Sequence, residues 1–286
     1  MIYLITVSLV WAFSFGLIGN TLAGVDSFFV ATVRLGSASL LFLPFLRVEF
    51  LTGFDCLRLL GYGFIQFGLM YVSYMSAFQY LPSHLVALFS IFTPLYVVLI
   101  HDLRNRQFSP RFLLAATLSV SGAAVIKMQG LTSGHFWLGF FLMQVAGIAF
   151  AFGQIAYRDW KQKYPSIHDR SVFALLAIGG TLCAGSFTIL YSEPLISEIS
   201  SVQWQSILYL GFIASGLGFF LWNTGACRTN PGILAAFNNA LVPLAVFVSL
   251  FVFGEIASVS MEAIFRLLIG GSLIALAVWV AIRKEA

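Results

Sequence analysis

The sequence predicts an all-α integral membrane protein with ten transmembrane helices, arranged as two inverted five-helix repeats. Composition is the first reason, because 60% of the 286 residues are hydrophobic, 9% are charged and the mean hydropathy is +0.95. A water-soluble domain carries about a quarter charged residues, so this chain uses lipid as its solvent. The second reason is that the apolar residues fall into ten blocks, and the third is an internal sequence repeat.

The expected helices follow from these apolar blocks and from the turn residues between them. A helix needs roughly 20 apolar residues to cross a bilayer, so ten spans use nearly the whole chain and leave no separate soluble domain. Prolines mark several of the breaks, as at Pro82, Pro110 and Pro231. We expect spans at residues 3–20, 27–46, 58–79, 84–102, 110–128, 136–157, 171–191, 204–226, 231–253 and 263–282.

The internal repeat joins the two halves of the chain. Residues 77–99 are identical to residues 226–248 at seven of 23 positions at an offset of 149, and AFSFGLI at 12–18 matches AFAFGQI at 149–155 in five of seven positions. Repeats with an odd number of spans lie in opposite orientations across the membrane and enclose a binding site between them. We therefore expect one repeat over 1–130 and a second over 131–286, together forming a single membrane domain.

Two prolines occupy matching mid-span positions in these repeats, Pro94 and Pro243. A proline inside a helix frees a backbone carbonyl and permits bending. That property suits a gating role, although proline kinks that serve only packing are equally common.

The distribution of basic residues predicts the orientation of the chain. Cytoplasmic loops carry an excess of Lys and Arg, and an N-terminus in the cytoplasm places twelve of the fifteen basic residues there. Both termini are then cytoplasmic. Because these charges sit in short loops between apolar blocks, we expect no binding of nucleic acid. The twelve residues are Arg47, Arg58, Arg104, Arg106, Arg111, Arg158, Lys161, Lys163, Arg170, Arg228, Arg283 and Lys284.

Acidic residues, histidines and cysteines argue against several function classes. All eleven acids lie at or near span ends, whereas proton pumps place a carboxylate in mid-membrane. The four histidines are scattered, the three cysteines are isolated, and no HExxH or GxSxG motif is present. We therefore expect no enzyme activity, no cofactor and no metal site.

Arg34 is the most informative charge, because it lies about seven residues into its span, roughly 10 Å from the end. A guanidinium there is costly unless it is paired or hydrated. Arg34 either binds a carboxylate that enters from outside or is a structural residue bonded to carbonyls. For Arg266 the structural interpretation is favoured, because Glu262 lies four residues before it on the same helix face. Lys127 is expected to reach the interface.

Uncharged polar residues within the spans are the other candidates for a substrate site. Amides in lipid need partners, and contacts between helices are the commoner answer. The consecutive residues Asn238 and Asn239 point about 100° apart on a helix, so we expect at least one to face a cavity. The thirty phenylalanines are expected to face mostly lipid. With Arg34, the candidate substrate-binding residues are Tyr71, Tyr74, Gln144, Trp222, Asn223, Asn238 and Asn239.

Several short stretches identify a related family. They include WAFSF at 11–15, FLPFLR at 42–47, TPLY at 93–96, ASGLGFF at 214–220, WN at 222–223 and NN at 238–239. In this order, and with the ten-span layout, they resemble the EamA-type drug/metabolite transporter family. The resemblance covers almost the whole chain. It implies uptake of biotin, or of a similar small carboxylate-bearing metabolite, across the cytoplasmic (inner) membrane of a bacterium.

The predicted function is therefore a secondary transporter that imports such a solute by alternating access, with the lipid bilayer as its other partner. Two alternatives stay open: an exporter of amino acids or amphipathic metabolites on the same fold, and a scaffold or sensor without transport. The chain is expected to be a monomer or a homodimer, and Gly147 with Ala151 forms a weak helix-pairing motif.

Overall fold

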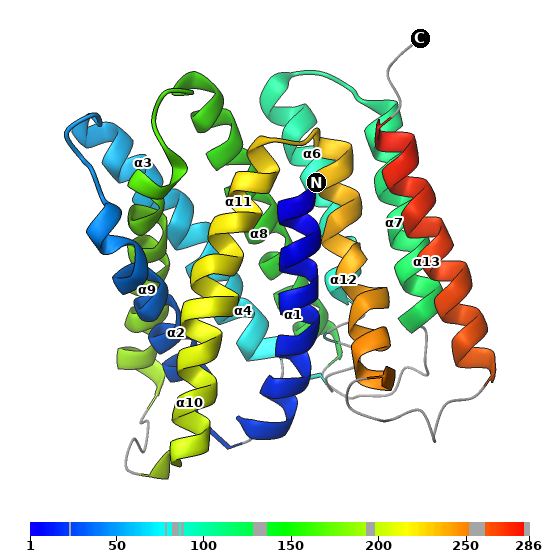
Figure 1. The fold of residues 1–286 in the computed structure, drawn as a ribbon, viewed down its shortest axis with the longest axis horizontal. Coiled ribbons are helices and arrows are strands. Elements are labelled where there is room, and N and C mark those ends of the chain that lie inside the picture. The colour runs from blue at the N-terminus through cyan, green and yellow to red at the C-terminus, as the bar shows by residue number, and fades with distance from the viewer. Residues whose placement is uncertain are drawn as a thin grey trace.

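The computed structural model describes residues 1–22, 24–77, 79–81, 86, 89–127, 136–192, 198–251 and 261–282. All secondary structure in these ranges is helical (Figure 1). Short 3-10 segments are η1 (Leu43–Phe45), η3 (Ser90–Phe92) and η4 (Asp169–Ser171), and two π segments are η2 (Phe64–Leu69) and η6 (Leu210–Leu217). The α-helices are α1 (Ile2–Thr21), α2 (Ser27–Phe42), α3 (Gly53–Gly63), α4 (Met70–Ala77), α6 (Thr93–Asn105), α7 (Pro110–Lys127), α8 (Phe136–Lys163), α9 (Phe173–Tyr191), α10 (Ser201–Tyr209), α11 (Gly218–Cys227), α12 (Pro231–Phe251) and α13 (Met261–Ile282).

Helices long and apolar enough to cross a membrane make this a multi-pass membrane protein. Within the described residues, five segments meet both criteria: Ser27–Phe45, Phe136–Lys163, Phe173–Tyr191, Ser201–Cys227 and Phe265–Ile282. Shorter apolar helices cover Ile2–Ser14, Pro110–Val125 and Pro231–Leu244. Each range expected from the sequence overlaps described helix, and the arrangement of ten spans stays a prediction.

Polar side chains define where several of these helices begin. Asp26 accepts a hydrogen bond from the backbone N–H of Phe29 at 2.7 Å and caps α2. Thr52 caps α3 in the same way, and Ser200 forms a reciprocal capping box at the start of α10. These caps satisfy backbone donors that have no partner within the helix, which is why short turns suffice between long helices.

Two continuous helices contain a π segment at their centre. The helix α3–η2–α4 runs from Gly53 to Ala77, and α10–η6–α11 runs from Ser201 to Cys227. Shifted by the sequence offset of 149, residues 64–69 fall at 213–218, which overlaps Leu210–Leu217. The two halves of the chain therefore share this local departure from α-helical geometry. Such segments are rare and frequently occur at functional sites.

The two sequence halves interleave rather than forming separate lobes. Helix α2 packs against α9 and η6, α3 and η2 pack against α9, and α7 packs along α13. Glycines allow the closest of these contacts. A Cβ atom on Gly63 would lie 1.8 Å from the carbonyl oxygen of Leu176, and one on Gly179 would lie 2.0 Å from that of Leu60. Small residues permit such close approach of helix backbones in membranes.

The start of α1 and the end of α13 lie on the same side of the bundle (Figure 1). The loops from α2 to α3, from α6 to α7, from α8 to α9 and from α11 to α12 lie on that side too. An ion pair joins two of the loop-proximal helices there, with Arg104 Nε 2.6 Å from Asp159 Oδ2. This is the side to which the basic residues of the sequence were assigned.

Candidate functional site

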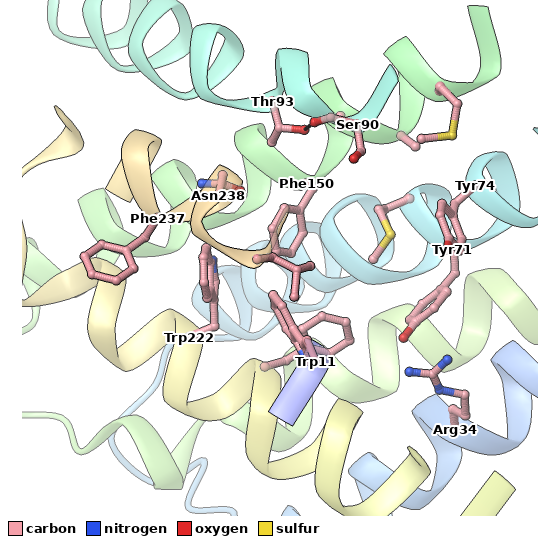
Figure 2. A pocket seen from close by; sticks show the side chains of 16 residues that line it. Trp11, Arg34, Tyr71, Tyr74, Ser90, Thr93, Phe150, Trp222, Phe237 and Asn238 are labelled. Atoms are coloured by element: carbon pink, nitrogen blue, oxygen red, sulfur yellow. Dashed lines mark hydrogen bonds between the residues drawn. The ribbon is translucent and has the colours of Figure 1, made fainter. Parts of the chain in front are cut away.

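A cavity of about 190 Å³ lies among α1, α2, α4, α6, α8, α11 and α12. Its walls are mostly apolar and aromatic, with polar side chains at separate places (Figure 2). Clefts of this kind between helices are usual sites for small ligands. The lining residues are Trp11, Arg34, Met70, Tyr71, Tyr74, Ser90, Thr93, Met143, Ala146, Gly147, Phe150, Phe219, Trp222, Phe237, Asn238 and Leu241.

Arg34 supplies the charge of this cavity. Its side chain comes from α2, is buried (4% exposed) and donates from Nε to Ser215 Oγ at 3.1 Å. The guanidinium carbon lies 4.9 Å from the ring centre of Tyr71, whose hydroxyl is 3.4 Å from Ser215 Oγ. No ion pair joins Arg34 to a carboxylate of the described residues. A buried cation without a counter-ion favours binding of an anion.

Aromatic rings form the middle of the cavity. Trp11 stacks on Trp222 with ring centres 5.0 Å apart and meets Phe219 edge-on at 5.4 Å. Phe150 lies 6.1 Å from Trp222. Both indole N–H groups have acceptors, since Trp11 donates to the Ala214 carbonyl at 2.8 Å and Trp222 to Gln154 Oε1 at 3.1 Å. The ring faces therefore remain as flat apolar walls.

A second polar region lies away from Arg34. Figure 2 shows Phe150 and Trp11 between Asn238 and Arg34, with Thr93 and Ser90 on the side of Phe150 away from Trp11. The Asn238 amide nitrogen donates to the Leu234 carbonyl at 2.8 Å, and the Thr93 hydroxyl donates to the Ser90 carbonyl at 2.8 Å. Uncharged donors and acceptors are thus held at the opposite end of the cavity from the guanidinium.

Five of the eight candidate residues from the sequence line this cavity, namely Arg34, Tyr71, Tyr74, Trp222 and Asn238. The other three do not, because protein groups bind their amides. Gln144 accepts from the Tyr96 hydroxyl at 2.6 Å, and Asn239 donates to the Ile91 carbonyl at 2.9 Å.

Asn223 forms a reciprocal pair with Gln66. The Gln66 amide nitrogen donates to Asn223 Oδ1 at 2.7 Å, and the Asn223 nitrogen donates back to Gln66 Oε1 at 3.3 Å. Both side chains are fully buried. The pair links η2 of the first half to α11 of the second, and serves to join helices.

The two prolines differ in their local structure. Pro243 lies inside α12, as expected of a mid-span proline. Pro94 lies in the first turn of α6, directly after the 3-10 segment Ser90–Phe92. Proline is well accommodated in a first turn, where its missing N–H costs no hydrogen bond. The adjoining Thr93 and Ser90 line the cavity, so the helix start at Pro94 shapes its wall.

Sequence reasoning missed several aromatic lining residues. Trp11, Phe150 and Phe219 were not among the candidates, and the expectation that phenylalanines face lipid is wrong for Phe150 and Phe219. A signal was present, since Trp11 and Phe150 belong to or adjoin the stretches that match between the halves. Hydropathy does not distinguish a ring that faces lipid from one that faces a cavity.

The structure also locates the remaining charged residues and the helix-pairing motif singled out in the sequence. Arg266 contacts Glu262 one turn away on α13, as expected, and the side chain of Lys127 lies outside the described residues. Gly147 faces the cavity with Thr93 and Tyr96 close by, and Ala151 is fully buried, so this motif contacts the chain's own helices. No group of three His, Cys, Asp or Glu side chains gathers among the residues that the structure describes.

Comparisons with known proteins identify relatives of this chain. Residues 1–128 match the EamA-like transporter family. The chain is 38% identical to a protein from Pseudomonas aeruginosa named probable biotin transporter, over 98% of the chain and 96% of that protein. It is 37% identical to proteins named biotin transporter from Salmonella typhimurium and Escherichia coli, over 87% of the chain and 84% of each relative.

A solved crystal structure at 18% identity has a TM-score of 0.78 and covers 98% of this chain and 96% of its own. This similarity supports the fold alone. The curated relatives extend over nearly the full length of the chain. The chain therefore belongs to the EamA-like transporter family, whose members transport solutes across membranes.

Proposed function

We propose that this protein imports biotin, or a similar small carboxylate-bearing metabolite, across the bacterial inner membrane. The single observation that carries the proposal is a central cavity with one buried arginine, aromatic walls and an uncharged polar end. Relatives named biotin transporter, at 37–38% identity, support the choice of solute. A cavity with one buried cation and apolar walls favours an amphipathic solute that carries a single carboxylate.

The chemical groups along biotin complement the groups along the cavity, in the same order. Its carboxylate suits Arg34, its aliphatic chain and fused rings suit the walls around Trp11 and Trp222, and its ureido group suits Asn238. Because Arg34 and Asn238 lie at opposite ends (Figure 2), one elongated molecule contacts both. Apolar walls with a few well-placed polar groups are what small-molecule sites use to fix orientation.

Arg34 is proposed to bind the carboxylate through the two terminal nitrogens of its guanidinium. Its Nε is already bonded to Ser215, and neither terminal nitrogen makes a hydrogen bond to another described residue. A planar guanidinium matches a carboxylate in a two-pronged geometry. The ring of Tyr71, 4.9 Å from the guanidinium carbon, restricts Arg34 to one orientation.

Alternating access is proposed as the transport mechanism. Ten spans, two inverted repeats (1–130 and 131–286) and cytoplasmic termini would give equivalent gates on the two sides of one central site. The π segments η2 and η6 lie at matching points of the two halves. Several residues that line the cavity lie in α4 and α11, the helices that directly follow these π segments. Pro94 and Pro243 are the proposed gating residues.

The proposal includes transport without strict coupling to protons. No acidic side chain lines the cavity among the described residues. Carboxylates within the membrane are the usual proton relays of coupled transporters. Uptake that persists after a protonophore collapses the proton gradient is the expected result, and uptake that stops at once would contradict this part.

The test is growth and uptake in a biotin-requiring strain that lacks its own uptake system. Expression of the chain should rescue growth at trace biotin and drive uptake of labelled biotin. Arg34→Ala should raise the apparent KM by about 10- to 100-fold, the loss expected for hydrogen bonds to a charged group. Arg106→Ala, which removes an exposed cation on the same chain, is the matched control.

Biotin methyl ester separates the proposed role of Arg34 from a structural one. The ester lacks the anion, so it should compete weakly in the wild type and equally weakly in Arg34→Ala. An Arg34→Ala variant with normal expression and an unchanged KM for biotin would refute the proposed role of Arg34 in binding the carboxylate. Lower cellular biotin on expression, with no competition by external biotin, would instead favour an exporter on the same fold.

A further inference from the structure

A second cavity, of about 830 Å³, lies at the end of the bundle where both termini lie. It is formed by η1 and the loop from α2 to α3 on one side, and by η4 and the loop from α8 to α9 on the other. Its lining includes Arg47, His168 and Arg170 together with Phe45, Phe50 and Tyr164. None of these residues belongs to the central cavity.

Hydrogen bonds and core packing hold the two loops in place. The backbone N–H of Arg47 donates to the Ser171 carbonyl at 3.0 Å, which ties the loops together. Tyr164 packs on the buried Trp160, with ring centres 5.0 Å apart. Lys161 donates from Nζ to the carbonyls of Pro165 and Ile167. The cavity is therefore a formed feature of the fold.

The charges of this cavity are positive. Arg47 and Arg170 are exposed and form no ion pair with a described carboxylate. The nearest acids in sequence are Glu49 and Asp169, and neither lines the cavity. Asp169 accepts a hydrogen bond from the Tyr157 hydroxyl at 2.6 Å. Two guanidinium groups, with His168 beside them, thus face a common space.

Apolar side chains lie next to these charges on the outer surface. Phe45 is 48% exposed and Phe50 is 65% exposed, and both line the cavity. Leu43, Phe54 and Leu57 on η1 and α3 are also exposed. In a membrane protein, exposed aromatic and aliphatic side chains at a helix end contact lipid at the level of the headgroups.

We propose that this cavity binds an anionic phospholipid, with its phosphate between Arg47 and Arg170 and its acyl chains along Phe45 and Phe50. Arginine binds phosphate oxygens in a two-pronged geometry, and basic pockets at membrane interfaces bind anionic headgroups. A free phosphate would satisfy the arginines but leave the adjoining apolar side chains uncovered. The inference is independent of the transported solute, because the two cavities share no residue.

Lipid retention on the purified full-length protein tests the proposal. The protein is placed in mixed micelles with equal amounts of phosphatidylglycerol and phosphatidylcholine, and bound lipid is counted by native mass spectrometry. A preference for phosphatidylglycerol of about 30-fold is expected, roughly fivefold for each arginine. Arg47→Gln/Arg170→Gln should abolish this preference, whereas Arg47→Lys/Arg170→Lys should retain part of it.

Arg106→Gln/Lys163→Gln is the control, because it removes two exposed cations that do not line the cavity. Thermal unfolding in phosphatidylcholine reports separately that each variant is folded. Equal retention of phosphatidylglycerol by the wild type and by Arg47→Gln/Arg170→Gln would overturn the proposal. So would a control variant that loses as much of the phosphatidylglycerol preference as Arg47→Gln/Arg170→Gln does. Stabilisation by inorganic phosphate through these arginines, without a preference for phosphatidylglycerol, would overturn it in favour of a free anion.

Discussion

The buried amide pair between Gln66 and Asn223 makes a quantitative prediction about stability. Both side chains are fully buried, and their two hydrogen bonds, at 2.7 and 3.3 Å, join η2 to α11. Asn223→Ala removes both bonds and leaves a donor and an acceptor of Gln66 without partners. Since each buried polar atom without a partner costs about 1–3 kcal/mol and two atoms are orphaned, we expect the free energy of unfolding to fall by about 2–6 kcal/mol.

The same reasoning predicts that removing both partners is less harmful than removing one. Gln66→Leu/Asn223→Ala keeps nearly the same total side-chain volume and leaves no orphaned amide. Replacement of both partners by apolar groups is often close to neutral, so the double variant should recover at least half of the loss. Gln66→Leu alone should resemble Asn223→Ala, because it orphans the amide of Asn223 in turn.

Thermal unfolding of the purified protein in detergent measures this cycle. At about 2–4 °C for each kcal/mol in a protein of this approximate size, Asn223→Ala should lower the Tm by about 4–24 °C. The apparent KM for the solute should not change, because neither side chain lines the central cavity. A Tm within about 1 °C of the wild type for Asn223→Ala, or a double variant as unstable as the two losses summed, would refute the reasoning.

Three further predictions follow from single contacts. Ser215→Ala removes the acceptor for the buried Arg34 Nε and should raise the apparent KM by about 3- to 10-fold and lower the Tm by about 2–12 °C. Gly63→Ala puts a Cβ atom 1.8 Å from the Leu176 carbonyl oxygen, so α3 and α9 cannot pack and folded protein should be largely lost. For Asp55, the hydrogen bond from the Thr52 hydroxyl lowers the carboxyl pKa, so this group stabilises the fold above pH of about 4 and loses that contribution as the pH falls through its folded pKa.

Each of these predictions has its own control. Ser186→Ala removes an exposed hydroxyl that bonds only its own helix, and it should leave KM unchanged. Gly61→Ala, two residues before Gly63, meets nothing within 4 Å and should be tolerated. If both glycine variants fold equally well, the predicted contact is wrong. Asp55→Asn should flatten the fall in Tm between pH 5 and 3, and an unchanged slope would contradict the assignment to this carboxyl.

Local sequence patterns were sufficient to place most of the helices, although some helix ends differ: α3 begins at Gly53 rather than at residue 58, and α8 ends at Lys163 rather than at residue 157. Asp26 and Thr52 cap helices where a polar residue precedes an apolar block, and Pro231 begins α12 as its position after a polar turn indicated. These features depend on a few neighbouring residues, because capping and proline geometry act within one helical turn. Hydropathy added the helix interiors, since lipid excludes charge from any span of sufficient length.

The candidate site was predicted only in part. Arg34 was recognisable because a charge inside an apolar block has few explanations in a membrane. Asn223 was equally polar and equally well placed, yet it pairs with Gln66, which is 157 positions away in sequence. Which amides pair with each other and which face a cavity depends on how the helices pack.

The sequence by itself determined that the chain is a membrane protein and where most of its helices lie, and it predicts that the two halves are related. Only the tertiary structure decided that α2 packs on α9, that Trp11, Phe150, Phe219 and Trp222 surround one cavity, and that a π segment holds Ser215 against Arg34. The physical reason is the range of the interactions. Burial in lipid and helix capping act on each segment separately, whereas a cavity exists only between segments, at the places where packed side chains fail to meet.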